Sequence, residues 1–388
     1  MKMRIRKIFG TSIILLLLLS VFTTIAMGVF EKKIEVYDLS NFETTMDLPY
    51  EGRLLIYVTE PLSRWNMFNQ EPYHFGSLGY AYNDVLSIEY LDTFEETIIW
   101  DGDVEEENVM VMAAVFNAGA HVGYANPPDG NPFEAHYTDA TAAAIPGEVG
   151  YNTVTGEFSH TVFVEEGTAT WCNNCPDMAE VLNTVYASGD YPFYYVALID
   201  DKSPGAPERL LNDYNRLGFP TAFFDGGYEV LIGSDTTEQE CRDAIESCGQ
   251  ADVHELNITL SVEYIGDGDL QIDISITNNE DFSHPIIEIG DVTSGLTNVQ
   301  SVVRNLGSEN ANAVEWSINI KGGILGLIDV TTEGTIETLD VGEEIPIQTE
   351  ELFFGFGKVD IIIEADEAGK IAQGFVVGPF IVLHYRLQ

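Results

Sequence analysis

The sequence predicts a multidomain protein in which a central α/β domain is flanked by β-sandwich regions. The hydrophobic pattern is that of short strands up to residue 146. It alternates between strand and helix from residue 157 to residue 249, and returns to strands after residue 256. A 28-residue leader would leave about 360 of the 388 residues, which is too long for one compact core and indicates two to four domains.

The N-terminal segment, residues 1–28, reads as a secretory signal peptide. A basic stretch (Lys2 to Lys7) is followed by an apolar stretch (Ile13 to Leu19) and by small residues at Ala26 and Gly28. An uncleaved anchor is the alternative, because residues 8–30 could just span a bilayer. Either way, the rest of the chain is expected outside the cytoplasm, secreted or at the cell surface.

The composition is strongly acidic. The chain has 63 Asp and Glu against 17 Lys and Arg, a net charge of −46 at pH 7, and the acids are spread through every segment. This pattern is typical of a solvated acidic surface. It argues against nucleic acid as a partner, because the phosphates would be repelled.

The first region, residues 34–146, has the pattern of a β-sandwich-like domain. Short runs rich in Ile, Val and aromatic residues alternate with turn residues, as in "RLLIYVTE" (53–60), "ETIIWDG" (96–102) and "NVMVMAAVFNAG" (108–119). The small and polar residues 140–150 read as a linker.

The second region, residues 151–250, alternates strands and helices, which indicates an α/β unit. Its expected elements are a strand "SHTVFVEE" (159–166), a helix opening at Cys175, a buried strand "YPFYYVALID" (191–200), a helix "PERLLNDYNRLG" (207–218), a hairpin "PTAFFDGGYEVLIG" (220–233) and a helix "TTEQECRDAIESCG" (236–249). Residues 254–281 then alternate as a hairpin, and residues 284–388 read as strands of a second sandwich.

The chemical signal is the pair Cys172 and Cys175 in "TWCNNCPDM". The pair stands at a strand-to-helix junction, which is expected to leave the first sulfur exposed at the helix tip and the second one turn inside. The helix N-terminus favours a thiolate at the first cysteine and lowers its pKa. Three readings are open: a redox dithiol, a static disulfide, or half of a metal site. A zinc site needs four ligands, and the sequence has no second CxxC and no HxxxH, so no metal and no cofactor is expected.

Residues 157–249 resemble a thioredoxin-like domain, through "TVFVEEGTATWCNNCP", "FYYVALID" and "GFPTAFFDGG" in that order. The resemblance implies that Cys172 attacks a substrate sulfur and that Cys175 resolves the mixed disulfide. Trp171 would flank the site. Glu166 would be a buried acid that assists proton transfer from the second cysteine, although an exposed acid at the end of a strand is an equal alternative.

The same resemblance implies a substrate-binding loop. Pro220 would be a cis-proline facing the dithiol, with Phe219 and Thr221 presenting backbone to an extended substrate. The chain departs from thioredoxin in its Asn173-Asn174 dipeptide, so the direction of the redox reaction cannot be read from the sequence.

More narrowly, "VEEGTATWCNNCP" resembles a family of secreted thioredoxin-like proteins, described among outer-membrane proteins, that carry a β-sandwich after the dithiol domain. In that light we expect the 254–281 hairpin to complete the N-terminal sandwich across the central domain. Residues 284–388, with "VRNLGSENANAVEWSI", resemble a CARDB- or immunoglobulin-like module.

Other residues carry weaker alternatives. Cys241 and Cys248 could form a bridge only if their helix ends early, because they lie seven residues apart. The histidines His74, His121 and His136 could meet at a metal, although loop histidines usually do not. "IGDGDL" (265–270) and "NPPDGNPF" (126–133) are read as turns rather than calcium loops. Asn257 opens an N-glycosylation sequon.

The sequence therefore predicts an exported thiol–disulfide oxidoreductase whose partners are protein thiols or disulfides of the cell envelope. Its β regions would position it at the surface or bind other surface proteins. The alternative is a surface binding or adhesion protein in which Cys172 and Cys175 stay permanently bridged.

Overall fold

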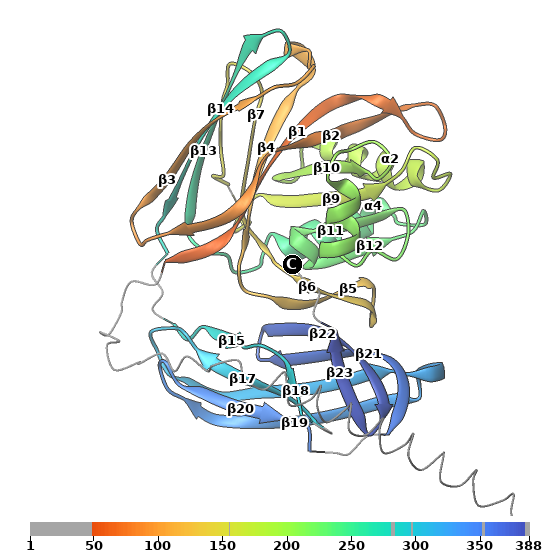
Figure 1. The fold of residues 1–388 in the computed structure, drawn as a ribbon. Coiled ribbons are helices and arrows are strands. Elements are labelled where there is room, and N and C mark those ends of the chain that lie inside the picture. The colour runs from red at the N-terminus through yellow and green to blue at the C-terminus, as the bar shows by residue number, and fades with distance from the viewer. Residues whose placement is uncertain (1–48, 155, 281–283, 296–297, 351–353, 385–388) are drawn as a thin grey trace, which may run out of the picture. The chain divides into compact units, whose positions relative to one another are not determined.

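The computed structural model describes residues 49–388 except 155, 281–283, 296–297, 351–353 and 385–388 (Figure 1). All of these residues fall within one compact unit, Met46–Gln388. The predicted signal peptide, residues 1–28, lies outside the described residues. Within those residues, no helix has the length and apolar character needed to cross a membrane.

The largest sheet has eight strands in the order β12-β11-β9-β10-β2-β1-β4-β7. Its strands are β1 (Tyr50–Asn66), β2 (Pro72–Ile88), β4 (Met110–Asn117), β7 (Thr138–Ala144), β9 (Val162–Thr168), β10 (Phe193–Ile199), β11 (Thr221–Phe224) and β12 (Glu229–Ile232). β9 and β10 run parallel, and β10 meets β2 in parallel where Ala197 pairs with Gly76. The other neighbours in this sheet are antiparallel.

A second sheet has the order β3-β14-β13-β8. It contains β3 (Thr93–Trp100), β8 (Val149–Tyr151), β13 (Leu256–Gly266) and β14 (Asp269–Asn278). The hairpin of β13 and β14 therefore pairs with β3 on one side and with β8 on the other. β5 (His121–Asn126) and β6 (Gly130–Ala135) form a separate two-stranded ribbon.

The C-terminal strands form two further sheets. In the four-stranded sheet the order is β15-β17-β16, and β20 also pairs with β17. The five-stranded sheet has the order β19-β18-β21-β22-β23. The first contains β15 (Ile287–Ile289), β16 (Thr293–Ser294), β17 (Val299–Asn305) and β20 (Glu344–Gln348). The second contains β18 (Ala311–Gly322), β19 (Ile328–Leu339), β21 (Gly355–Ala365), β22 (Ala368–Gly378) and β23 (Phe380–His384). One apolar core joins these strands.

Helical segments are few and short among the described residues. They are α2 (Cys175–Ser188), α3 (Ala206–Glu208), α4 (Glu238–Cys248), the 3-10 turns η2 (Glu106–Asn108), η4 (Asp225–Gly227) and η5 (Ile324–Gly326), and the π-helical turn η3 (Arg209–Asp213). α2 begins at Cys175, as predicted, with a proline in its first turn. The helix expected over residues 207–218 is shorter, since α3 and η3 end at Asp213.

β1 contributes to two apolar cores, one on each of its faces. Its run "RLLIYV" is apolar without alternation because both faces of the strand are covered. Leu55 and Tyr57 belong to the cluster that contains α2, α4, β9 and β10. Leu54 and Ile56 belong to the cluster that β13 and β14 close from the other side. Figure 1 shows β1 between these two groups of elements.

The predicted fold class is wrong. We expected a central thioredoxin-like α/β domain flanked by separate β-sandwiches, but the described residues are 56% strand and 13% helix, in five sheets, which fits an all-β fold. The strands expected in the central domain, β9 to β12, continue into β2, β1, β4 and β7 within one sheet. Strand pairing across the expected domain border replaces an independent α/β unit. The proposed division into domains stays a prediction.

Candidate functional site

The candidate site is the Cys172–Cys175 disulfide at the start of α2. The Cα atoms of the two cysteines lie 5.5 Å apart. The backbone N–H of Cys172 donates to the carbonyl of Ala169 at 3.0 Å, which closes the turn after β9. Cys175 is fully buried, whereas 6% of Cys172 is exposed. Cys172 is therefore much less open than the sulfur at the helix tip that the sequence predicts.

An aromatic group covers this disulfide. Phe219 packs against the small cluster of Ala169 and the two cysteines. The ring of Trp171 meets that of Phe219 edge-on, with centroids 5.7 Å apart, and Trp171 is 61% exposed. The guanidinium of Arg216 lies over the ring of Phe219, 3.8 Å from its centroid. The packing of Phe219 is why Cys172 is almost covered.

The loop with Pro220 lies at the start of β11. The Phe219–Pro220 peptide bond is cis, as the resemblance implied. Thr221 is fully buried, and its hydroxyl donates to the carbonyl of Gly218 at 3.1 Å. Its backbone pairs with Gly167 in β9 and with Ile232 in β12. The Thr221 side chain thus has a partner inside the protein, and its substrate-binding role stays a prediction.

Glu166 lies in β9, six residues before Cys172, and is fully buried. This rules out the alternative of an exposed acid at the end of a strand. Among the described residues, neither of its carboxyl oxygens has a hydrogen-bond partner. Burial raises the pKa of Glu166 to about 8, so the carboxyl is mainly protonated at neutral pH. Near neutral pH the protonated form can give a proton, and the minor carboxylate form can take one.

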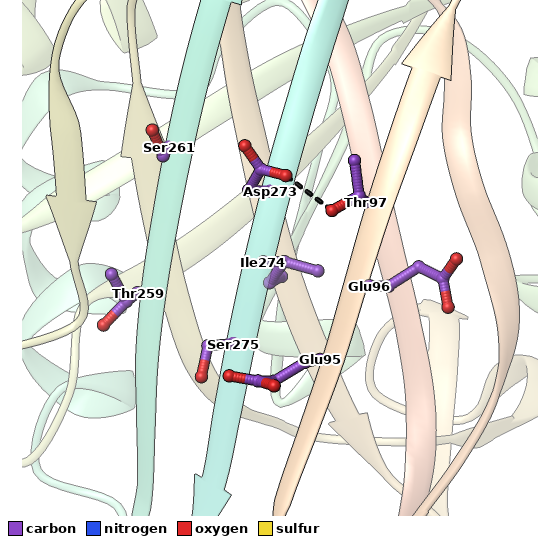
Figure 2. Close-up of a pocket in the computed structure, with 8 residues that line it drawn as sticks. All are labelled: Glu95, Glu96, Thr97, Thr259, Ser261, Asp273, Ile274 and Ser275. Atoms are coloured by element: carbon purple, nitrogen blue, oxygen red, sulfur yellow. Dashed lines mark hydrogen bonds between the residues drawn. The ribbon is translucent and has the colours of Figure 1, made fainter.

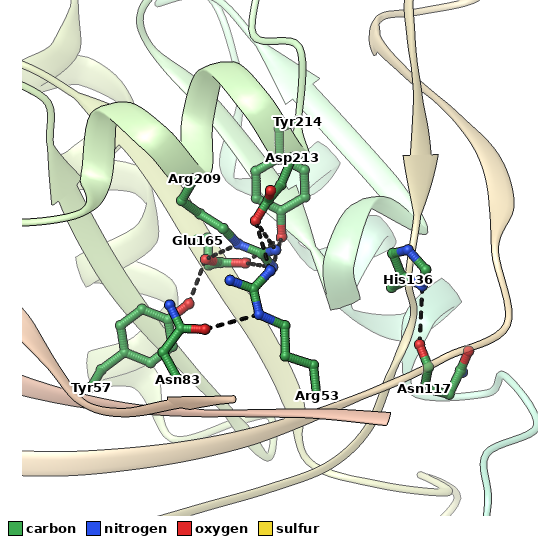
Figure 3. A network of polar contacts seen from close by, with 9 residues as sticks. All are labelled: Arg53, Tyr57, Asn83, Asn117, His136, Glu165, Arg209, Asp213 and Tyr214. Atoms are coloured by element: carbon green, nitrogen blue, oxygen red, sulfur yellow. Dashed lines mark hydrogen bonds and ion pairs between the residues drawn. The ribbon is translucent and has the colours of Figure 1, made fainter. Parts of the chain in front are cut away.

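The neighbouring Glu165 lies in a network that the sequence analysis missed (Figure 3). Arg209 donates to both of its carboxyl oxygens, at 3.0 Å and 2.8 Å, and Tyr57 donates at 2.6 Å. Tyr214 donates to the same carboxylate and receives a bond from Arg209 at 2.8 Å. Burial alone would lower the pKa of Arg209, but Glu165 and Tyr214 raise it well above its usual value.

The outer end of this network reaches the surface. Arg209 and Arg53 each donate to Oδ2 of Asp213 at 3.0 Å, and Arg53 also donates to Asn83 at 2.9 Å. Arg53 is 39% exposed in its side chain, against 7% for Arg209. One hint was available in the sequence: "VFVEEGT" places two adjacent acids in an apolar strand, where each needs an explanation.

The loop before Cys172 is held by two further groups. The carboxylate of Asp201 accepts from the backbone N–H of Thr170 at 2.9 Å and from its hydroxyl at 2.5 Å. The hydroxyl of Tyr73, in β2, donates to the carbonyl of Ala169 at 3.0 Å. These bonds fix the backbone that presents Trp171 and Cys172.

The other two cysteines take no part in a disulfide. Cys241 and Cys248 are both free and buried in α4. Burial raises the pKa of Cys241 to about 12. Burial also raises the pKa of Cys248, beside Asp225. Both thiols are therefore protonated and inert at neutral pH.

The three histidines considered as metal ligands have separate surroundings. His74 contacts the carbonyl of Pro61 at 3.2 Å, and His136 that of Asn117 at 3.1 Å. His121 stacks on Tyr137 with centroids 3.9 Å apart. Across the described part of the chain, no group of three or more His, Cys, Asp or Glu side chains is arranged to hold a metal ion.

Two hollows among the described residues lie away from the disulfide. The larger, of about 350 Å³, lies on the outer face of β3, β14 and β13, where Thr97 donates to Asp273 at 2.6 Å (Figure 2). A smaller one, of about 150 Å³, lies beside Arg53, Tyr80 and Arg209.

Comparisons with known proteins leave the family open. No family model matches the chain, and no curated protein matches it. A crystal structure of a protein from Agrobacterium tumefaciens is similar over 61% of this chain and 98% of that one, at 15% identity and a TM-score of 0.20. So low a score carries no argument about fold or function.

Proposed function

We propose that this protein exchanges disulfides with thiols or disulfides of other proteins through Cys172 and Cys175, and that its partners are proteins of the cell envelope or the extracellular space. The carrying observation is Glu166. A fully buried carboxyl without a hydrogen-bond partner destabilises the fold. A static disulfide has no need of such a group, whereas a dithiol that gives and takes protons does.

The reaction would proceed in two balanced steps. With the site reduced, the Cys172 thiolate attacks one sulfur of a substrate disulfide, forms a mixed disulfide and releases the other substrate sulfur as a thiolate. Cys175 then loses its proton and attacks the sulfur of Cys172, which releases the second substrate sulfur. Two electrons pass from the dithiol to the substrate. The same steps reversed oxidise a substrate dithiol.

Named groups support each step. The first turn of α2 lies next to Cys172, and its N-cap residue Asn174 makes no side-chain cap bond. Glu166 can accept the proton of Cys175 during resolution, or return one in the reverse direction. Trp171 and Phe219 offer an apolar surface beside the sulfur that reacts first.

The near-complete burial of Cys172 favours a second candidate, a surface binding protein with a permanent disulfide. An attacking sulfur must be reachable, and only 6% of this residue is exposed. For exchange, Trp171 or Phe219 has to move aside when a substrate approaches. In the second candidate the disulfide only ties the start of α2 to the preceding loop.

Trapping distinguishes the two candidates. The Cys175→Ser variant should accumulate mixed disulfides between Cys172 and substrate proteins, because the resolving sulfur is absent. The matched control is the Cys172→Ser, Cys175→Ser variant, which retains Cys241 and Cys248 and should trap nothing, since both are buried. Insulin reduction by the wild type measures the same chemistry. If the wild type does not reduce insulin and Cys175→Ser traps no more protein than the control, the exchange function is excluded.

A further inference from the structure

The five-stranded C-terminal sheet carries an exposed apolar surface at one end of β21, β22 and β23. We call it the C-terminal apolar face. It consists of Phe354, Phe356, Phe375, Val377, Phe380 and Val382. The exposed fraction of these residues runs from 42% for Phe375 to 76% for Phe354. Large hydrophobic side chains gathered on one surface mark an interaction site, whereas scattered ones do not.

The strand register shows that these side chains are contiguous. Phe356 pairs with Val377, which pairs with Phe380 on the next strand. Phe375 pairs with Val382 in the adjacent row. Alternate residues of a strand point to the same side of a sheet, so both rows share one face. Phe354 extends the first row, with its ring centroid 6.3 Å from that of Phe356.

The edge of the sheet that adjoins the C-terminal apolar face lacks charged side chains that would prevent strand pairing. β23 is an edge strand, and Phe380–His384 contains no Asp, Glu, Lys or Arg. The opposite edge, β19, carries the acids Asp329, Glu333 and Glu337. Charged side chains on an edge strand prevent pairing with other strands. One edge of the sheet is therefore blocked by charge, and the other, β23, has β22 as its only paired strand among the described residues.

The exposed area is on the scale of a dimer interface. A buried aromatic side chain covers roughly 150–250 Å², so four half-exposed phenylalanines and two valines offer on the order of 500 Å². A standard interface takes about 800 Å² from each partner. The C-terminal apolar face and the β23 edge together approach that size.

The charge distribution favours a second copy of this chain. With a net charge of −46, two copies repel one another over most of their surface. None of the six residues of the face is acidic, and the charged residue within its rows is Lys358, paired with Phe375. Lys358 is exposed, and Asp360 stands two residues further along β21. A two-fold axis can set the lysine of one copy near the aspartate of the other.

We propose that the chain forms a homodimer through the C-terminal apolar face and the β23 edge. A lipid surface would cover the phenylalanines but would leave the unpaired backbone groups of β23 without hydrogen-bond partners. A second copy offers both an apolar face and a strand. This interface is independent of the disulfide and of the function proposed for it.

Analytical ultracentrifugation of the full chain tests the proposal. The wild type should sediment as a dimer at protein concentrations of about 10–100 µM. The Val377→Glu, Phe380→Glu variant should weaken the dimer at least tenfold, because two charges would be buried at the contact. The matched control is Val85→Glu, which changes a 77% exposed valine of β2 and should leave the dissociation constant within about twofold.

Salt gives a second measurement. Raising the ionic strength from about 0.1 M to 1 M should strengthen the dimer severalfold, because it screens the repulsion between acidic copies without weakening apolar contact. A wild type that stays monomeric would overturn the proposal. This holds if other residues of the chain cover the C-terminal apolar face, and it holds if the face binds phosphatidylcholine vesicles instead. So would a dimer that the double variant leaves unchanged, since its interface would lie elsewhere.

Discussion

Glu165 and Glu166 are adjacent, fully buried residues of the same strand, and their surroundings are opposite. Glu165 receives hydrogen bonds from Arg209, Tyr57 and Tyr214. Glu166 receives none, and burial raises its pKa to about 8. Because consecutive strand residues point to opposite faces, one residue step separates a satisfied charge from a neutral acid. A buried acid that is held by an ion pair and a buried acid that is kept neutral thus look alike in the sequence, and only their hydrogen-bond partners tell them apart.

The largest expected effect on the free energy of unfolding comes from removing the charge of Glu165. Replacing Glu165 with Gln leaves the buried guanidinium of Arg209 without its main counter-charge, which should lower the free energy of unfolding by about 3–5 kcal/mol. Urea unfolding at pH 7 measures this. The Glu165→Gln, Arg209→Met variant is the control and should recover part of the loss. A single-variant loss under about 1 kcal/mol would show that the network contributes little.

The buried carboxyl of Glu166, which has no hydrogen-bond partner, predicts that the stability of the fold depends on pH. A pKa of 4.5 in the unfolded chain and about 8 in the folded one means that unfolding releases a proton between these values, so the wild type loses stability as pH rises from about 4.5 to about 8. Glu166→Gln should lack this loss and exceed the wild type by about 3 kcal/mol at pH 8.5. The two pKa values give roughly 5 kcal/mol at about 1.4 kcal/mol per pH unit, and the gain of the variant is smaller because the amide of Gln buries one more hydrogen-bond donor than the protonated acid. Parallel pH profiles of the two proteins in urea would contradict the assignment.

A single hydrogen bond to Glu165 should be worth less than its ion pair. Tyr57→Phe removes the hydroxyl that donates at 2.6 Å and should destabilise the fold by about 1.5–2 kcal/mol. Tyr151→Phe, at a tyrosine that is 56% exposed, is the control and should change stability by less than about 0.5 kcal/mol. Thermal unfolding of both variants makes the comparison, and equal effects would refute it.

The smallest effect is expected at the exposed end of the network. Arg53→Ala removes an ion pair to Asp213 whose side chains are 39% and 31% exposed. The loss should be at most about 1 kcal/mol at low salt and should vanish near 1 M salt. Urea unfolding at two salt concentrations measures it. A loss that persists at high salt would show that the bond to Asn83, rather than charge, is what matters.

Local features of the site could be predicted from the sequence. The start of α2 at Cys175 was predicted, whereas the disulfide of Cys172 with Cys175 and the burial of Glu166 were each one of the alternatives that the sequence left open. The partners of Glu165 could not be predicted, because Tyr57 and Arg209 lie 108 and 44 residues away along the chain. Periodicity identifies the face a residue occupies but not what packs on it.

The fold class failed for the same reason. The strand patterns were read as separate domains, since alternation reports burial within a segment and not which strands become neighbours. One available signal pointed the other way: "RLLIYV" in β1 is apolar on both faces, so it needs a layer on each side. The open environment expected for Cys172 also failed, because the covering ring, Phe219, comes from a distant loop.

The pairing of Gly76 with Ala197 has a consequence for biosynthesis. A Cβ on Gly76 would lie 2.4 Å from the hydroxyl oxygen of Ser63 in β1, so this position of β2 favours a residue with no side chain. The hairpin of β1 and β2 must wait for β9 and β10, and its other side must wait for β13 and β14. A ribosome therefore releases the chain from Tyr50 to Cys248 before the first core can close, and the chain to Asn278 before the second can close. Such long-range closure predicts slow folding, during which the nascent strands need protection from aggregation.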